Sequence, residues 1–203
     1  MATETLRPNG NSQTELINSS GNYTNNYTYV DESVTNDSDY VRCLTGSATG
    51  VWATDLYALP DTAIPAGSTI NSITFYARFC EENGGNDYAK FAYKSGGTVY
   101  YSSAPNITTS FATYSWEQNT NQKTSAAWTI DDINALTAGI SLYGTGGKSP
   151  VVGRCSQFWL VIDYTEAAGW THITKINGIA SANIAKVNGI AVANIAKVNG
   201  IAV

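Results

Sequence analysis

The most constraining feature of this sequence is an 11-residue unit that recurs through residues 173–203. It reads Ile-Thr-Lys-Ile-Asn-Gly-Ile-Ala from Ile173, and Ile-Ala-Lys-Val-Asn-Gly-Ile-Ala from both Ile184 and Ile195. Eleven residues could form three helical turns at about 3.67 residues per turn. Each unit, however, has Asn-Gly at its centre, and a glycine inside a helix costs about 1 kcal/mol. Asn-Gly between β-branched residues is the strongest short hairpin signal, so the repeat predicts strand, turn and strand.

A hairpin turning at Asn188-Gly189 places Val187 opposite Ile190 and Ala185 opposite Val192, which gives it one apolar face. Such a face would aggregate if it stayed exposed, so a neighbouring surface must cover it. We predict that the tail mediates oligomerisation or anchoring. Three copies winding together are favoured, and docking into an adjacent protein is the alternative. The predicted contact residues are Ile173, Ile176, Ile179, Ile184, Val187, Ile190, Val192, Ile195, Val198 and Ile201.

The sequence before the repeats is typical of an all-β protein. Charged residues make up 13% of the chain, whereas aromatic residues are plentiful, with 13 Tyr and 5 Trp. The clearest strand is 69–80, where inward apolar residues alternate with Thr74, Tyr76 and Arg78. Residues 8–26 are expected to be turn and loop. The other expected strands are residues 27–30, 40–44, 51–57, 88–94, 98–102, 114–116, 139–143 and 155–164, the last of them central in its sheet.

One helix is expected between the strands. Thr129 can cap its N-terminus, Asp131 and Asp132 lie in its first turn, and it would run up to Gly139. Many short strands with turn-rich connections predict an all-β fold, a jelly-roll β-sandwich with one short helix, followed by a C-terminal β-repeat tail. The expected units are the sandwich at 1–166, a linker at 167–172 and the tail at 173–203.

Charge and cysteine content exclude several classes of partner. The net charge of −5 argues against nucleic-acid binding. The head through residue 172 carries a balance of −8, and the tail adds three lysines. The sequence shows neither a signal peptide nor an apolar stretch long enough for membrane insertion. Cys43, Cys80 and Cys155 show no metal-ligand spacing and are expected to be buried free thiols of a protein folded in a reducing cytoplasm.

Candidate chemical groups have simpler structural interpretations. The chain's one histidine, His172, falls in the expected linker and not beside a nucleophile. Asp31, Glu32, Asp37 and Asp39 could supply oxygens to Ca²⁺, but their spacing does not match an EF-hand and suits turn-forming acids better. We therefore predict no catalytic residues, no cofactor and no metal site.

A set of short segments follows one another along the head in a recognisable order. They are residues 4–9 (Glu-Thr-Leu-Arg-Pro-Asn), 30–32 (Val-Asp-Glu), 37–41 (Asp-Ser-Asp-Tyr-Val), 55–59 (Asp-Leu-Tyr-Ala-Leu), 70–78 (Ile-Asn-Ser-Ile-Thr-Phe-Tyr-Ala-Arg), 128–136 (Trp-Thr-Ile-Asp-Asp-Ile-Asn-Ala-Leu) and 162–164 (Ile-Asp-Tyr). This order resembles a jelly-roll domain common in structural proteins of tailed bacteriophages and related prophages. The Lys-Ile/Val-Asn-Gly-Ile repeats also resemble segments of phage tail and virion proteins. The resemblance covers nearly the whole chain and implies a virion component, without catalytic residues.

The expected function is therefore a non-enzymatic structural component of a phage virion, in the capsid decoration, tail or fibre. It would be made in the host cytoplasm and would bind copies of itself and other virion proteins. One alternative is a glycan-binding or host-adhesion module, in which Trp52, Tyr100 and Tyr101 stack on sugars if they point outward. Another is a self-assembling extracellular filament subunit. Core packing is expected for Trp128 and Trp159.

Overall fold

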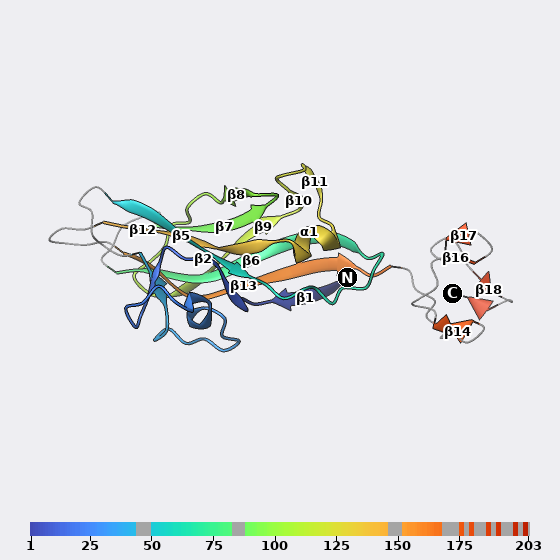
Figure 1. Ribbon diagram of the computed structural model, residues 1–203, viewed down its shortest axis with the longest axis horizontal. Coiled ribbons are helices and arrows are strands. Elements are labelled where there is room, and N and C mark those ends of the chain that lie inside the picture. Colours follow the sequence, from blue (N-terminus) through green and yellow to red (C-terminus); the bar gives the residue numbers. More distant parts are fainter. Residues whose placement is uncertain are drawn as a thin grey trace.

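The structure, a computed structural model, describes residues 1–43, 50–82, 88–145 and 152–167, and six two-residue strands between residues 175 and 202. The head is an all-β sandwich of two antiparallel sheets, elongated along the strands (Figure 1). In these ranges the two helices have four and five residues, and neither is long enough to cross a bilayer.

The first sheet has six strands. In spatial order they are β3 (Ile17–Asn18), β4 (Val41–Arg42), β13 (Gly153–Thr165), β6 (Thr69–Glu81) and β9 (Ala112–Gln118), with β1 (Ala2–Leu6) also paired to β13. The two long strands β13 and β6 pair along their length and form the centre, as predicted for β13. On the other side of β13, β1 pairs with residues 160–164 and β4 with Arg154 and Cys155.

The second sheet has five strands. In spatial order they are β2 (Gly10–Gln13), β5 (Val51–Ala58), β12 (Thr137–Gly144), β7 (Ala89–Ser95) and β8 (Thr98–Tyr101). β12 lies in the middle and pairs with β5 on one side and β7 on the other. The β7–β8 hairpin turns at Gly96 and Gly97, whose φ angles of 55° and 86° suit glycine. The hairpin predicted at this position is confirmed.

The strand order in the two sheets is that of a jelly roll. Between β4 and β13, the strands that belong to these two sheets alternate between them, except at the β7–β8 hairpin. They produce the orders β4-β13-β6-β9 and β5-β12-β7-β8. Eight strands in two such sheets form the two Greek keys of this fold. The predicted fold class is confirmed. β2 and β3 extend the edges of the two sheets, and β1 pairs with the central strand β13.

Alternating side chains from both sheets form the core. The inward residues of β6 are completely buried, as predicted: Ile73, Phe75, Ala77 and Phe79. Phe75 stacks on Tyr93 of β7 with ring centroids 5.4 Å apart, so this contact joins the two sheets. Trp128 is 3% exposed, and its indole N–H donates to the Gln118 carbonyl at 3.0 Å. Cys80 and Cys155 are buried free thiols, and Cys43 is also buried.

A short hairpin and the helix precede β12. The hairpin pairs β10 (Thr120–Asn121) with β11 (Ala126–Ala127), and the helix α1 spans Ile130–Asn134. Thr129 caps α1 in a capping box with Asp132, as the sequence predicts. The helix does not reach Gly139, however. Residues from Thr137 onward join the sheet, because pairing with both β5 and β7 outweighs the local helical pattern.

The N-terminal segment differs from the prediction. Residues 8–26 contain β2 and β3, and the strand expected at 27–30 is instead the 3₁₀ helix η1 (Asn26–Tyr29). The buried carboxylate of Asp55 explains this difference. It accepts hydrogen bonds from the backbone N–H groups of Glu15 and Leu16, at 2.7 and 2.8 Å, and from the side-chain amide of Asn26 at 2.7 Å. These partners lie 29 to 40 residues from Asp55, beyond the reach of a local pattern.

The repeats form β-structure with the predicted register. Each repeat contains one antiparallel pair with two residues, Asn-Gly, between its strands. The pairs are β14 (Lys175–Ile176) with β15 (Ile179–Ala180), β16 (Lys186–Val187) with β17 (Ile190–Ala191), and β18 (Lys197–Val198) with β19 (Ile201–Ala202). Val187 lies opposite Ile190, as expected. The pair of Ala185 and Val192, and the linker from residue 168 to 172, lie outside the described residues.

Candidate functional site

The predicted oligomerisation residues fall partly within the described strands. In each repeat, the two residues beside the Asn-Gly are aliphatic and lie directly opposite each other. These pairs are Ile176 with Ile179, Val187 with Ile190, and Val198 with Ile201. The other predicted contact residues lie outside the described chain, as does His172: they are Ile173, Ile184, Val192 and Ile195.

Within the acidic segment 31–39, Asp37 is bonded to the strands β6 and β13. The Asp37 carboxylate forms a two-pronged ion pair with Arg78, at 2.7 and 3.0 Å, and accepts a hydrogen bond from Ser156 Oγ at 2.7 Å. The hydrogen bond from Arg78 is the main reason that the pKa of Asp37 is lowered. Within the described ranges, no group of three or more His, Cys, Asp and Glu residues could hold a metal ion.

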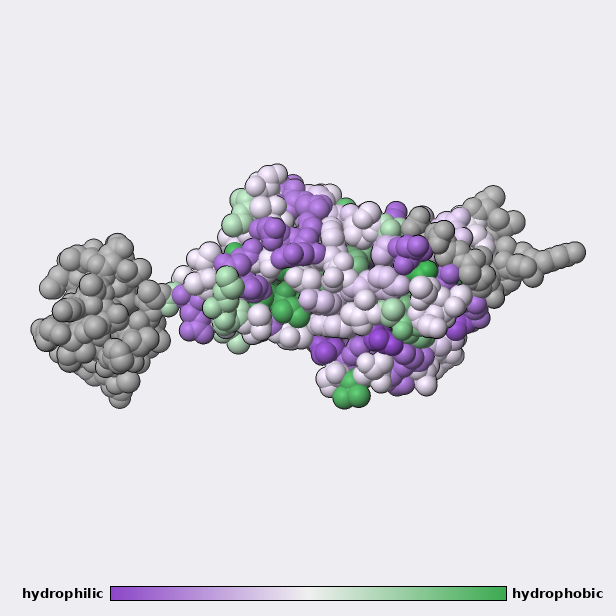
Figure 2. Space-filling view, turned by 180° about the vertical axis from the view of Figure 1, so that it is seen from behind, coloured by the Kyte–Doolittle hydropathy of each residue, from purple (hydrophilic) through white to green (hydrophobic). Residues whose placement is uncertain are grey.

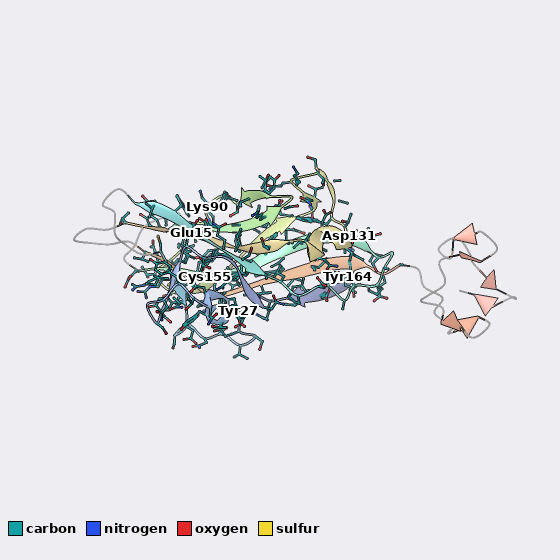
Figure 3. The ribbon with its side chains drawn as sticks, viewed as in Figure 1. Glu15, Tyr27, Lys90, Asp131, Cys155 and Tyr164 are labelled. Atoms are coloured by element: carbon teal, nitrogen blue, oxygen red, sulfur yellow. The ribbon has the colours of Figure 1, made fainter. Side chains whose placement is uncertain are left out.

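An open depression lies on the outer face of the five-stranded sheet. Its volume is about 360 Å³, at the lower end of the range for ligand sites. Each of the five strands contributes at least one residue to its lining, and Glu15 comes from the segment that follows β2. Figure 3 shows two of its members, Glu15 and Lys90, near the strands β5, β12 and β7. The lining residues are Gln13, Glu15, Trp52, Thr54, Lys90, Tyr101 and Ser141.

Sheet register places a polar row across the middle of the depression. Thr54 of β5 pairs with Ser141 of β12, which pairs with Lys90 of β7. Thr54 Oγ1 donates to Ser141 Oγ at 2.9 Å, and Ser141 Oγ donates to the Ala53 carbonyl at 3.3 Å. The Tyr101 hydroxyl lies 3.5 Å from Thr54 Oγ1. The row thus combines two hydroxyls with the ammonium group at its end.

Glu15 brings a carboxylate to one side of this row. Its Oε2 accepts from the Thr54 backbone N–H at 2.8 Å, and its Oε1 accepts from Gln13 Nε2 at 2.9 Å. Its own backbone N–H donates to Asp55 on the inner face of the same sheet. Burial raises the pKa of Asp55, and the hydrogen bonds from Leu16, Asn26 and Glu15 oppose that rise. Both ends of Glu15 are therefore fixed to β5.

Two exposed aromatic side chains flank the row. Trp52 is 39% exposed and Tyr101 is 47% exposed. The Lys90 ammonium lies 4.1 Å from the Trp52 ring centroid, within the range of a cation–π contact. Tyr143, the partner of Trp52 on the neighbouring strand β12, packs beside it with ring centroids 5.4 Å apart.

The sequence predicted part of this site. The sequence names Trp52, Tyr100 and Tyr101 as sugar-stacking candidates if they point outward, and Trp52 and Tyr101 line the depression. Tyr100 does not, because successive residues of a strand point to opposite faces: its ring stacks on the buried Tyr93 at 5.3 Å. Glu15 and Lys90 were missed, since they meet Trp52 only through strand pairing. The Trp-x-Thr alternation at the start of β5 is the one local signal that could have extended the prediction.

The depression can hold a small polar molecule between aromatic rings and hydrogen-bonding groups. The Lys90 ammonium forms no salt bridge within the described ranges, where the ion pairs are Arg78 with Asp37 and Arg154 with Glu82. Its donors therefore remain available to a ligand, as do the second lone pairs of the Glu15 oxygens. No protein-family model and no curated protein matches the sequence.

Proposed function

We propose that this chain is a non-enzymatic structural component of a tailed-bacteriophage virion, in the capsid decoration, tail or fibre, and that it assembles through its C-terminal repeats. The observation that carries the proposal is the recurrence of one hairpin pairing in all three repeats, after a complete jelly-roll head. The ordered resemblance of the head segments to phage structural proteins supports the same role.

The hairpins give a physical reason for assembly. The described part of each hairpin consists of two antiparallel strands, with two residues of one paired to two of the other. An isolated two-stranded hairpin is marginal in water, and three or more strands or a packed neighbour are needed for stability. Unpaired strand edges beside aliphatic residues also favour association with other strands. Three copies of the tail would satisfy these edges symmetrically, and we propose a homotrimer that also contacts other virion proteins.

The surface and charge of the head suit a domain that is displayed on the outside of a particle. Figure 2 shows one side of it, where hydrophobic residues form small separate areas among polar and pale ones. The head also carries a balance of −8, whereas the tail has three lysines and no acid. Like-charged heads repel one another weakly, so the tail is the better candidate for the contact between copies.

Truncation after Glu166 tests the proposal. Light scattering of the full chain should give the mass of an oligomer, and the truncated chain should give the mass of a monomer. The truncated chain should keep its far-UV circular dichroism and its cooperative unfolding, because the jelly roll closes with β13 (Gly153–Thr165). It should also fail to enter particles when it is co-produced with the other virion proteins. Equal masses for the two chains would remove the tail from the assembly.

A further inference from the structure

We propose that the depression on the outer face of the five-stranded sheet is a binding site for neutral saccharides. The inference goes beyond the assembly role, since it concerns the head and does not depend on the repeats. It is carried by three features of the lining: where the exposed aromatic rings lie, which hydrogen-bonding groups accompany them, and how the charges balance.

The exposed aromatic rings are concentrated in this depression. Within the described residues three aromatic side chains are exposed, Tyr23, Trp52 and Tyr101, and the last two line the same hollow. Exposed rings gain from packing against a flat apolar surface, and Trp and Tyr keep a polar group for the surrounding water. The C–H face of a pyranose ring supplies such a surface, with hydroxyl groups around its rim.

The polar groups of the depression match those hydroxyls. The carboxylate of Glu15 only accepts hydrogen bonds, and the ammonium of Lys90 only donates them. A hydroxyl group does both, so two neighbouring hydroxyls of one sugar can donate to Glu15 and accept from Lys90. Hydrogen bonds to charged groups are stronger than those between neutral groups, which makes this pair the main source of orientation.

The charges favour a neutral ligand. One carboxylate and one ammonium line the depression, so they balance. An acidic sugar or a phosphate would bring a second negative charge near Glu15. That carboxylate cannot turn away without losing its bonds from Gln13 and the Thr54 backbone. Like charges held close together in a partly desolvated site lower affinity, so acidic ligands are disfavoured.

The Glu15 carboxylate, which accepts hydrogen bonds in this site, is already held in position without a ligand. Asp55, buried under the sheet, holds the Glu15 backbone, and Thr54 holds its carboxylate. A side chain that is already ordered loses little entropy on binding, so more of the interaction energy contributes to affinity. Asp55 is thus a positioning residue for the site, which it does not line.

Glycan-array screening followed by titration in saturation-transfer NMR tests the inference on the full chain. The neutral probes are glucose, galactose, mannose, N-acetylglucosamine and their short oligomers, and the acidic probes are glucuronic acid and N-acetylneuraminic acid. We expect at least one neutral class to bind, with acidic probes at least tenfold weaker. If no neutral probe binds, or if acidic probes bind more tightly, the proposal is wrong.

Substitutions locate the binding site. Trp52→Ala and Tyr101→Ala should each weaken neutral binding at least tenfold. Tyr23→Ala is the matched control, because Tyr23 is 45% exposed and Tyr101 47%, and it should bind as the wild type does. Thermal unfolding of each variant checks the fold, and Tyr101, on an edge strand, carries the test if Trp52→Ala does not fold. Binding that survives both substitutions would place the saccharide elsewhere.

A substitution at Glu15 tests whether charge explains the preference for neutral saccharides. Glu15→Gln keeps the shape of the side chain but removes the negative charge. It should weaken neutral binding and reduce the discrimination between neutral and acidic probes by at least fivefold. A merely structural role for Glu15 would lower the affinity for both kinds of probe by the same factor, and that result would overturn the argument from charge.

Discussion

The outer face of each sheet carries a tryptophan that contacts a tyrosine ring and a cationic side chain, but the two tryptophans differ in how they are packed. On the six-stranded sheet, Trp159 of β13 stacks on Tyr76 of β6 with centroids 5.2 Å apart and an angle of 7° between the rings. Arg7 lies 5.4 Å from the Trp159 ring, and its guanidinium also donates to the Glu32 carbonyl. We call this face closed, because Tyr76 and Arg7 pack against the half-buried Trp159 ring and the Glu32 carbonyl fixes the cation.

The five-stranded sheet has an open counterpart. Trp52 also carries a cation, Lys90, over its ring, but it remains 39% exposed. The nearest aromatic ring, Tyr143, is tilted by 53° and not stacked flat on it. The comparison teaches that an aromatic residue on a sheet surface stabilises the fold when its ring is covered and can serve binding when it is not. The two faces should therefore respond differently to matched substitutions.

The largest effect is expected for the aspartate beneath the open face. Asp55→Ala leaves the backbone N–H groups of Glu15 and Leu16 without their acceptor. Unfolding free energy should fall by about 3 kcal/mol, which lowers the melting temperature by about 8 °C. Saccharide binding should weaken too, since Glu15 is released. The measurement is urea unfolding combined with the NMR titration.

The matched change on the closed face is Asp163→Ala. Asp163 is only half-buried and accepts a hydrogen bond from Asn71 Nδ2 at 2.7 Å. Its loss should cost less than about 1 kcal/mol and leave binding unchanged. Equal losses of stability for Asp55→Ala and Asp163→Ala would show that the buried network does not anchor the N-terminal segment.

Replacing each of the two tryptophans in turn by alanine tests the comparison between the faces. Trp159→Ala should lower the unfolding free energy by about 2 kcal/mol, because a stacked and half-buried ring is lost, and should leave saccharide binding intact. Trp52→Ala should cost less than about 1 kcal/mol of stability while it weakens binding at least tenfold. Both are measured by urea unfolding and titration. The distinction between open and closed faces fails if Trp159→Ala weakens binding as much as Trp52→Ala.

A smaller effect should follow from removing one hydroxyl at the open face. Tyr101→Phe keeps the ring but removes the hydroxyl that lies 3.5 Å from Thr54 Oγ1. Affinity for the neutral saccharide should fall about fivefold, equivalent to about 1 kcal/mol, with stability unchanged. Tyr76→Phe on the closed face is the control and should alter neither property. A tenfold or greater loss in Tyr101→Phe would mean that the hydroxyl, and not the ring, dominates the contact.

Local patterns in the sequence predicted the fold class and most strands of the two sheets, but not the N-terminal strands β2 and β3 or the 3₁₀ helix η1. The alternation along 69–80 and the Gly96-Gly97 turn depend on neighbouring residues, and both are present as expected. The prediction for Trp159, by contrast, was wrong. Its apolar surroundings predicted core packing, yet it points to the outer face opposite Tyr76, because Phe158 and Leu160 take the inward positions of the strand. An apolar run does not reveal which of its residues point inward.

The candidate site was less accessible to sequence reasoning. Trp52 and Tyr101 could be named as exposed candidates, but the residues that complete the site are separated widely along the chain. Glu15 reaches Thr54 across 39 residues, and Thr54 reaches Ser141 across 87. Only the strand order of the jelly roll and the register of β12 bring these groups together. Long-range pairing, rather than any local motif, assembles the depression.

The last prediction concerns Glu32, beside the closed face. Burial, together with the nearby charges of Asp31 and Asp39, raises its pKa from 4.5 to about 7, and Arg7 opposes this rise. Between those values the folded chain keeps a proton that the unfolded chain releases. The unfolding free energy should therefore fall as the pH rises from 4.5 to about 7, and this contribution should be constant above that.

Glu32→Gln should remove this slope, as measured by urea midpoints at pH 5 and pH 8. Glu117→Gln, on the exposed side of β9, leaves Glu32 in place and should keep the slope of the wild type. A slope that persists in Glu32→Gln would show that another group releases this proton, and the closed face would then not control the pH dependence of unfolding.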